Sequence, residues 1–163
     1  MLSIKNKDKL NKEDSLKYLK YNNKRIKQNI IFYDDFKYEG EMKNGRPDGK
    51  GIMTYSNGNI YKGEFKKGRP DGKGIMTYSN GNKYEGEWKK GFRKGKGIYY
   101  YLNEDIYDGN WKNGKPNGNG ILNKNGFEYE GIWSSENENI KCNGVVKNKD
   151  KDIIFEGKFK INE

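Results

Sequence analysis

Residues 38–60 read YEGEMKNGRPDGKGIMTYSNGNI, and residues 61–83 read YKGEFKKGRPDGKGIMTYSNGNK. Weaker copies of the same 23 residues follow at 84–106, at 107–128 and, in degenerate form, at 129–154. A repeat of this length is one small supersecondary unit, which buries its apolar side chains only by stacking on neighbouring units. The fold of the chain therefore depends on the secondary structure of a single unit.

Each unit predicts a β-hairpin. In the opening YEGEM, the Tyr, Gly and Met alternate with two glutamates, which is the two-residue period of a strand. The segment NGRPDG at 44–49 holds the residue types that build turns, and GKGIMTYS at 49–56 predicts the second strand. The Asn-Gly pair within SNGN at 56–59 strongly favours a tight turn before the next unit. The chain is therefore predicted to be all-β, an antiparallel meander of repeated β-hairpins.

Glycine recurs in register inside the predicted strands. A glycine within a strand weakens it unless another group needs the space above it, and large rings are available at the first and fifth places of the units. We therefore expect aromatic rings to lie over the glycines and to replace a conventional thick core. These glycines are Gly40, Gly63, Gly86, Gly109, Gly131 and Gly157 at the third place, and Gly51, Gly74, Gly97 and Gly120 at the fourteenth.

The composition restricts the chemistry of the chain. Of 163 residues, 22 are Gly and 13 are Tyr, which favours strands and tight turns over a helical bundle. There is no His and only one Cys, Cys142, which excludes His-based catalysis, His metal sites and an internal disulfide. No apolar run reaches the length of a membrane span, and the Lys-rich start lacks the apolar core of a signal peptide. We expect a non-catalytic cytoplasmic protein that is not secreted and that uses no metal or cofactor.

The units resemble the membrane occupation and recognition nexus (MORN) repeat. The resemblance covers residues 38–163 and rests on YEGEW at 84–88, on the G-x-G pair that opens the second strand, and on the x-Y-x-N-G-x turn before the next unit. It implies an elongated, twisted antiparallel sheet with a groove along one face, in a scaffold at a membrane-associated or cytoskeletal structure. The fourth unit departs from the pattern at Lys124, and the fifth lacks the first G-x-G.

The chain divides into a tail and a repeat domain, because no glycine occurs near its start. Residues 1–29 form a basic, Lys/Asn-rich tail, which is either disordered or a single helix over Lys12–Lys27 with a heptad-like apolar stripe. Residues 30–163 form the repeat domain. Its half-unit at 30–37 predicts a strand that covers the first repeat, and a partial unit follows at 155–163.

The favoured function is the binding of a protein partner in the groove. Aromatic side chains carry much of the binding energy at protein interfaces, and a helix or an extended peptide is a common occupant of a groove. The residues expected to line the groove are Tyr38, Tyr61, Phe65, Tyr84, Trp88, Tyr107, Trp111, Tyr129 and Trp133.

The alternative function is the binding of anionic phospholipid along a basic edge. The formal net charge is +10, and basic residues recur in the same turn of successive units, where we expect them to stack about 10 Å apart. Nucleic acid is less favoured, because the strand glutamates repel phosphates. The sheet edges also allow copies of the chain to associate. The residues expected to form the basic edge are Lys66, Lys67, Arg69, Lys73, Lys89, Lys90, Arg93, Lys94 and Lys96.

Overall fold

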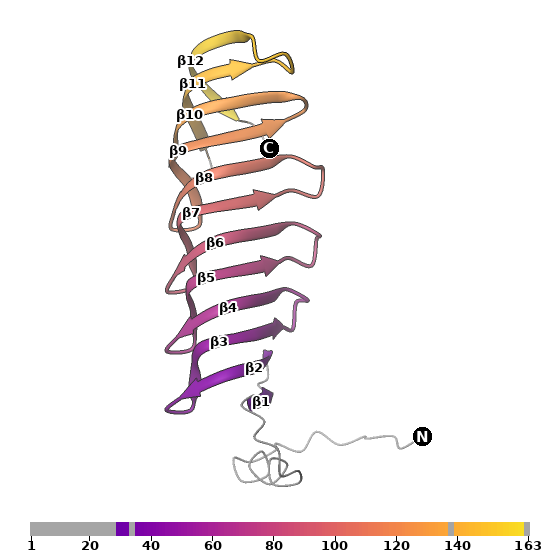
Figure 1. Cartoon of the computed structure of the whole chain (residues 1–163), viewed down its shortest axis with the longest axis vertical. Helices are drawn as coiled ribbons and strands as arrows, with labels where there is room; N and C mark the ends of the chain where they lie inside the picture. Colours follow the sequence, from indigo (N-terminus) through magenta and orange to yellow (C-terminus); the bar gives the residue numbers. More distant parts are fainter. Residues whose placement is uncertain (1–28, 33–34, 137–138, 162–163) are drawn as a thin grey trace, which may run out of the picture.

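The computed structural model describes residues 29–32, 35–136 and 139–161. They form one sheet of twelve antiparallel strands in chain order (Figure 1), which confirms the predicted meander of hairpins. No helix of the described part is long and apolar enough to cross a membrane. The helix predicted over Lys12–Lys27 lies outside the described residues. The strands are β1 (Asn29–Phe32), β2 (Phe36–Lys43), β3 (Arg46–Tyr55), β4 (Ile60–Lys66), β5 (Arg69–Thr77), β6 (Lys83–Lys89), β7 (Phe92–Tyr100), β8 (Ile106–Lys112), β9 (Lys115–Lys124), β10 (Phe127–Glu136), β11 (Asn139–Lys147) and β12 (Ile153–Ile161).

The turn inside each unit is shorter than the sequence predicted. Asn44 and Gly45 alone join β2 to β3, with positive φ angles of 51° and 72°, the conformation of a two-residue type I′ turn. The prediction of a connection over 44–49 is wrong, because the second strand already begins at Arg46 and Pro47 lies within its pairing to β2. Positive φ angles recur at the same two places in the next three units.

A line of glycines crosses the sheet from β2 to β12, and each glycine pairs with the glycine of the next strand. The predicted register is confirmed, and Gly144 in β11 extends it. A Cβ added at Gly63 would lie 2.5 Å from the Cα of Gly74 and 2.6 Å from the carbonyl oxygen of Lys73. A Cβ added at Gly74 would overlap the hydroxyl group of Tyr61. Only glycine therefore fits along this line from Gly40 to Gly144, whereas at Gly157 the nearest atom to an added Cβ lies 3.3 Å away, in the ring of Phe155.

The tyrosine that opens each of the first four units lies over this line. These four tyrosines are at most 1% exposed. Each hydroxyl donates a hydrogen bond to the carbonyl oxygen three residues further on, as Tyr38 does to Glu41 at 2.8 Å. The expectation of rings over glycines is confirmed for the glycines of these four units, whereas a Cβ added at Gly131 would meet the carbonyl oxygen of Asn143 and the Sγ of Cys142 and no ring.

The aromatic residue at the fifth place joins successive tyrosines into one core. The ring of Trp88 meets Tyr84 of its own unit and Tyr61 of the preceding unit edge-to-face, with centroids 5.1 and 5.2 Å apart. Its indole Nε1 also donates to the carbonyl oxygen of Gly74 at 3.1 Å. Equivalent contacts continue from β2 to β10. We call this side of the sheet the ring face, and it takes the place of a second packed layer.

The longer turns at the opposite edge are joined through asparagine. The Oδ1 of Asn59 accepts the backbone N–H of Ser79 at 2.9 Å, and the next unit repeats this bond. The third unit has Asp105 at this place, only 6% exposed, and its carboxylate lies 3.9 Å from the ammonium group of Lys124. Lys124 stands where the earlier units have tyrosine, and Asp105 stands where they have asparagine. The two departures from the repeat therefore form an ion pair with each other.

Candidate functional site

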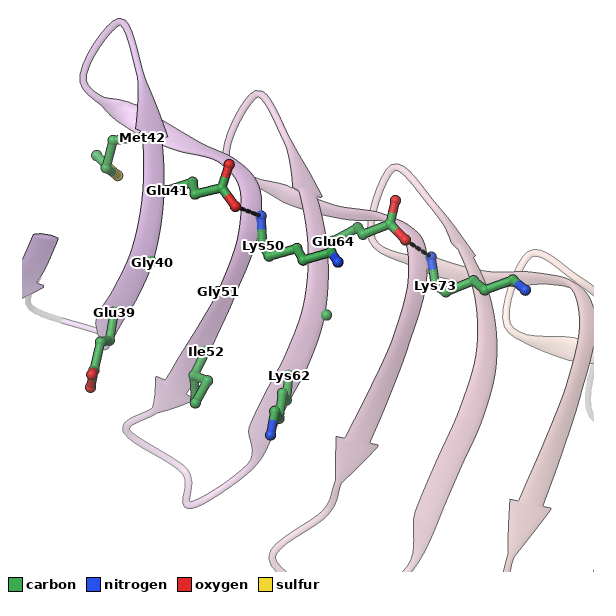
Figure 2. Close-up of a pocket in the computed structure, with 11 residues that line it drawn as sticks. Glu39, Gly40, Glu41, Met42, Lys50, Gly51, Ile52, Lys62, Glu64 and Lys73 are labelled. Atoms are coloured by element: carbon green, nitrogen blue, oxygen red, sulfur yellow. Dashed lines mark hydrogen bonds between the residues drawn. The ribbon is translucent and has the colours of Figure 1, made fainter. Parts of the chain in front are cut away.

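The face opposite the rings has two hollows along the axis of the sheet, and Figure 2 shows the residues that line the first of them. One hollow of about 880 Å³ lies across β2 to β5, and a second of about 740 Å³ lies across β4 to β8. Both are lined by Lys62, Gly63 and Lys73. The two hollows therefore adjoin one another along these residues, and we call them together the groove.

The second strand of each of the first three units places a lysine and an isoleucine in the groove. Residues two apart in a strand point to the same face, so Lys50 and Ile52 stand on either side of Gly51. The triplet recurs at 73–75 in β5 and at 96–98 in β7. We call each triplet a Lys-Gly-Ile rung. The pairing registers place the rungs in line, two strands apart.

A glutamate from the preceding strand is held by the backbone of each rung lysine. The register shifts between Gly40 and Met42, and Glu41 in this bulge accepts the backbone N–H of Lys50 at 3.2 Å. The next two units repeat the bond at 3.3 and 3.2 Å, and Figure 2 shows the first two of the series. The ammonium groups of the three rung lysines form no ion pair with any described residue.

The charges of the groove are balanced in number. Three acidic and three basic residues line each of the two hollows. Two of the acids already form ion pairs with lysines outside the groove, because Glu39 lies 4.0 Å from Lys37 and Glu85 lies 3.1 Å from Lys83. The groove lining therefore carries no net charge, and its electrostatic character lies in the pattern of its charges.

The aromatic residues predicted to line the groove lie on the ring face instead. These rings pack against the line of glycines. Because they are buried there, almost none of their surface is accessible to a partner. The aromatic composition assigned to the groove is therefore corrected: the rings form the core, and the groove is aliphatic and charged. Eight of the nine residues are at most 6% exposed and Tyr129 packs against them, the eight being Tyr38, Tyr61, Phe65, Tyr84, Trp88, Tyr107, Trp111 and Trp133.

The residues of the predicted basic edge occupy three different places. Lys73 and Lys96 lie in the groove. Arg93 packs among rings, with its guanidinium carbon 4.4 Å from the ring centroid of Trp111 and with Nη2 donating to the carbonyl oxygen of Gly114. The remaining six are exposed in or beside the turns at one edge of the sheet, and they are Lys66, Lys67, Arg69, Lys89, Lys90 and Lys94.

One carboxylate links two turns of this edge. Asp71 accepts hydrogen bonds from the ammonium group of Lys89 at 3.1 Å and from the backbone N–H of Lys90 at 3.3 Å. Desolvation opposes ionisation of Asp71, but these two bonds outweigh it and hold the pKa of the carboxyl below its usual value. The turn of the third unit is therefore fixed to the strand that precedes it, and one of its lysines is already neutralised.

The single thiol is a core group. Cys142 is 2% exposed and pairs in register with Trp133. Burial raises the pKa of Cys142 to about 11, so the thiol stays protonated near neutral pH and is a weak nucleophile. Within the described part of the chain, no three His, Cys, Asp or Glu side chains are grouped so as to hold a metal ion.

The family model of the MORN repeat matches residues 38–60, 61–83, 84–105 and 107–126, more than half of the chain. The chain belongs to the MORN repeat family. A search of curated proteins finds no match to the chain. The first three MORN repeats each contain one Lys-Gly-Ile rung, whereas the fourth has Asn119 in place of the lysine.

Proposed function

We propose that this MORN repeat protein is a scaffold that binds a protein partner in its groove, at a membrane-associated or cytoskeletal structure. MORN repeats are in general non-catalytic modules of scaffolds and membrane-associated proteins. The observation that carries the proposal is the hollow across β2 to β8, whose isoleucines and lysines take no part in the ring core. Ile52 keeps 37% of its surface exposed there, and that apolar surface is available to a partner.

The dimensions of the groove favour a protein segment as its occupant. Strands lie about 4.8 Å apart, so the seven strands β2 to β8 extend over about 29 Å. A small molecule would contact only a fraction of that length. A segment of protein would contact the aliphatic and the charged side chains together, as at ordinary interfaces.

The proposal is tested by identifying the partner and then removing the apolar floor of the groove. The tagged full chain is cross-linked in the cells that naturally express it, and the bound protein is identified by mass spectrometry. The affinity of that protein for the chain is then measured with purified components. Ile52→Arg combined with Ile75→Arg is expected to weaken binding at least tenfold. The matched control is Ile153→Arg with Ile154→Arg, two exposed isoleucines on β12 outside the groove. A partner that the groove variant binds as tightly as the parent does would refute the proposal.

A second candidate function is the binding of anionic phospholipid, and one observation favours it. Phe92 lies at the basic edge, 58% exposed, where the first two units have arginine. An exposed ring beside lysines is typical of surfaces that enter the headgroup region of a membrane. Sedimentation with phosphatidylserine vesicles at physiological salt tests this candidate. Charge reversal at Lys66, Lys67, Lys89 and Lys90 should abolish sedimentation if lipid is the ligand, whereas binding of a partner in the groove should persist.

A further inference from the structure

The spacing of the Lys-Gly-Ile rungs matches the heptad period of an α-helix. Two strands span about 9.6 Å at the usual strand separation, so the first and third rungs lie about 19 Å apart. Seven residues of an α-helix rise about 10.5 Å, and fourteen rise about 21 Å. A helix lying along the groove therefore presents one residue of each heptad to each rung.

The side chains of the rungs define what such a helix must carry. Ile52, Ile75 and Ile98 offer an aliphatic contact at every rung. The rung lysines offer ammonium groups without ion pairs among the described residues, and the neighbouring glutamates accept backbone N–H groups. Aliphatic side chains facing the isoleucines and carboxylates facing the lysines would satisfy both rows.

The chemistry of the groove disfavours two other occupants. An extended proline-rich peptide docks into grooves lined by aromatic rings, and the core rings here lie on the opposite face. A nucleic acid or another polyanion needs an excess of positive charge, and each hollow has three acidic residues for three basic ones. An α-helix satisfies its own backbone hydrogen bonds, so it makes no demand on the groove for backbone partners.

We infer that the groove binds an amphipathic α-helix in which an aliphatic residue and an acidic residue each recur every seven positions over at least three heptads. This inference rests on the scaffold function proposed above and specifies the chemistry of its partner. The fourth MORN repeat, with Asn119 in place of lysine, ends the row of ammonium groups after three rungs.

Three labelled helical peptides of equal length, titrated against the full chain by fluorescence anisotropy, test the spacing. The first has Leu at every seventh position and Glu four residues after each Leu, in an alanine-rich background. The second has the same composition, with Leu and Glu recurring every five residues. The third has Lys in place of Glu. The first peptide is expected to bind at least tenfold more tightly than the other two, and equal affinity for the first and second would overturn the inference.

Variants of the rungs test which lysines take part. Each of Lys50→Gln, Lys73→Gln and Lys96→Gln should weaken binding of the first peptide about two- to fivefold, the range for an exposed ion pair. The triple variant should weaken it at least tenfold. The control is the triple variant Lys66→Gln, Lys67→Gln and Lys89→Gln, which removes the same charge from the turn edge and should change affinity less than twofold. Equal losses in the two triple variants would overturn the inference, because net charge alone would then explain binding.

A gain of affinity is the sharper test. Asn119→Lys adds a fourth lysine in line with the other three, so a peptide one heptad longer should bind this variant about two- to fivefold more tightly than the parent chain. The original peptide should bind both equally. An oligothymidylate or a phosphatidylserine vesicle that binds the parent more tightly than the first peptide does, with the same dependence on the rung lysines, would instead identify the groove as a polyanion site.

The scaffold function and the helix inference fail in different ways. If the partner of the protein is lost with the Ile52→Arg and Ile75→Arg variant but is unaffected by the triple rung variant, the groove binds protein and the helix inference is wrong. If the partner survives the isoleucine variant, the scaffold function of the groove is wrong. Unchanged thermal midpoints for all variants establish that each loss arises at the interface.

Discussion

The ring face and the groove face are made by alternate residues of the same strands, yet the residues of the ring face stay the same along the repeats and those of the groove face change. On the ring face one arrangement of tyrosine over glycine persists from β2 to β9. On the groove face the lysine of the rung changes to asparagine at Asn119, and the bulged glutamate changes to Asn110. The difference shows that the side chains that hold the fold and the side chains that line the groove point to opposite faces of each strand, so either set can change without the other.

Alkaline pH should have the largest effect, because ionisation of the buried tyrosines of the ring face unfolds the sheet. Burial, with a smaller contribution from Glu41, raises the pKa of Tyr38 to about 12, and burial raises the pKa of Tyr61, Tyr84 and Tyr107 further. Each pKa is higher in the folded than in the unfolded chain, so the stabilisation is complete below pH 10 and is lost as pH rises through the folded values. The free energy of unfolding should fall by roughly 1 kcal/mol per pH unit for each tyrosine.

This loss is measured by circular dichroism together with the absorbance of tyrosinate between pH 9 and pH 12. Ionisation of the four tyrosines should coincide with loss of the sheet signal. Ionisation of every tyrosine near pH 10 with the sheet intact would contradict burial of the rings.

Gly63→Ala should have the next largest effect, a loss of about 3 kcal/mol in the free energy of unfolding. The new Cβ would overlap backbone atoms of Gly74 and Lys73. Backbone atoms, unlike side chains, cannot change rotamer to relieve the overlap. The control is Gly68→Asn in a turn with open space around it, where asparagine tolerates the left-handed conformation. Urea denaturation of both variants tests the comparison, and equal midpoints would mean that no close approach exists at the glycine line.

Lys124→Tyr should cost about 2 kcal/mol, because it removes the cation that faces the buried carboxylate of Asp105. Asp105→Asn in the same chain restores the pair of residues found in the earlier units and should recover most of the loss. A double-mutant cycle by chemical denaturation measures the coupling. Additive losses would show that the two departures from the repeat arose independently of each other.

Trp88→Phe should cost about 1 to 2 kcal/mol, chiefly through the hydrogen bond from Nε1 to the Gly74 carbonyl oxygen. The second unit already has Phe65 at this place, so the edge-to-face contacts should survive. The reverse exchange, Phe65→Trp, should recover about 1 kcal/mol in the same background. Thermal denaturation of the two single variants and the double variant gives the three values.

Substitutions in the groove should have the smallest effect on stability. Lys73→Gln and Ile75→Thr are expected to change the free energy of unfolding by less than about 0.5 kcal/mol each, because neither side chain enters the ring core. Equilibrium denaturation is the measurement. A loss as large as that of Trp88→Phe would mean that the groove face also supports the fold.

Local sequence was sufficient for the repeat, the meander and the glycine register, because each follows from a period and a turn signal. It was insufficient to assign the two faces. Both Ile52 and Met53 are apolar, and the sequence contains nothing local to decide which one faces the rings. Aromatic anchors of a partner and aromatic residues of a core are the same residue types, so the rings were assigned to the groove. The contact that distinguishes them, Tyr38 over Gly51, joins two different strands.

The structure of the degenerate fifth unit also could not be predicted from local sequence. Gly144 extends the glycine line only because β11 pairs with β10 across an altered hairpin, and the fifth unit lacks the motif that marked the other glycines. The structure also shows the bulged glutamates bound to backbone N–H groups, an arrangement that depends on the register shift of each hairpin and has no signature in composition.

The strict chain order of the strands has a mechanical consequence. Because each strand bonds only to its sequence neighbours, tension along the axis of the sheet loads the hydrogen bonds of one strand at a time, and the sheet unravels from its ends at low force. A released unit of 23 residues extends to about 75 to 80 Å, far beyond the roughly 10 Å that it occupies in the sheet. A ligand lying across β3 to β7 would splint those strands, so that the same domain is compliant when free and stiff when bound.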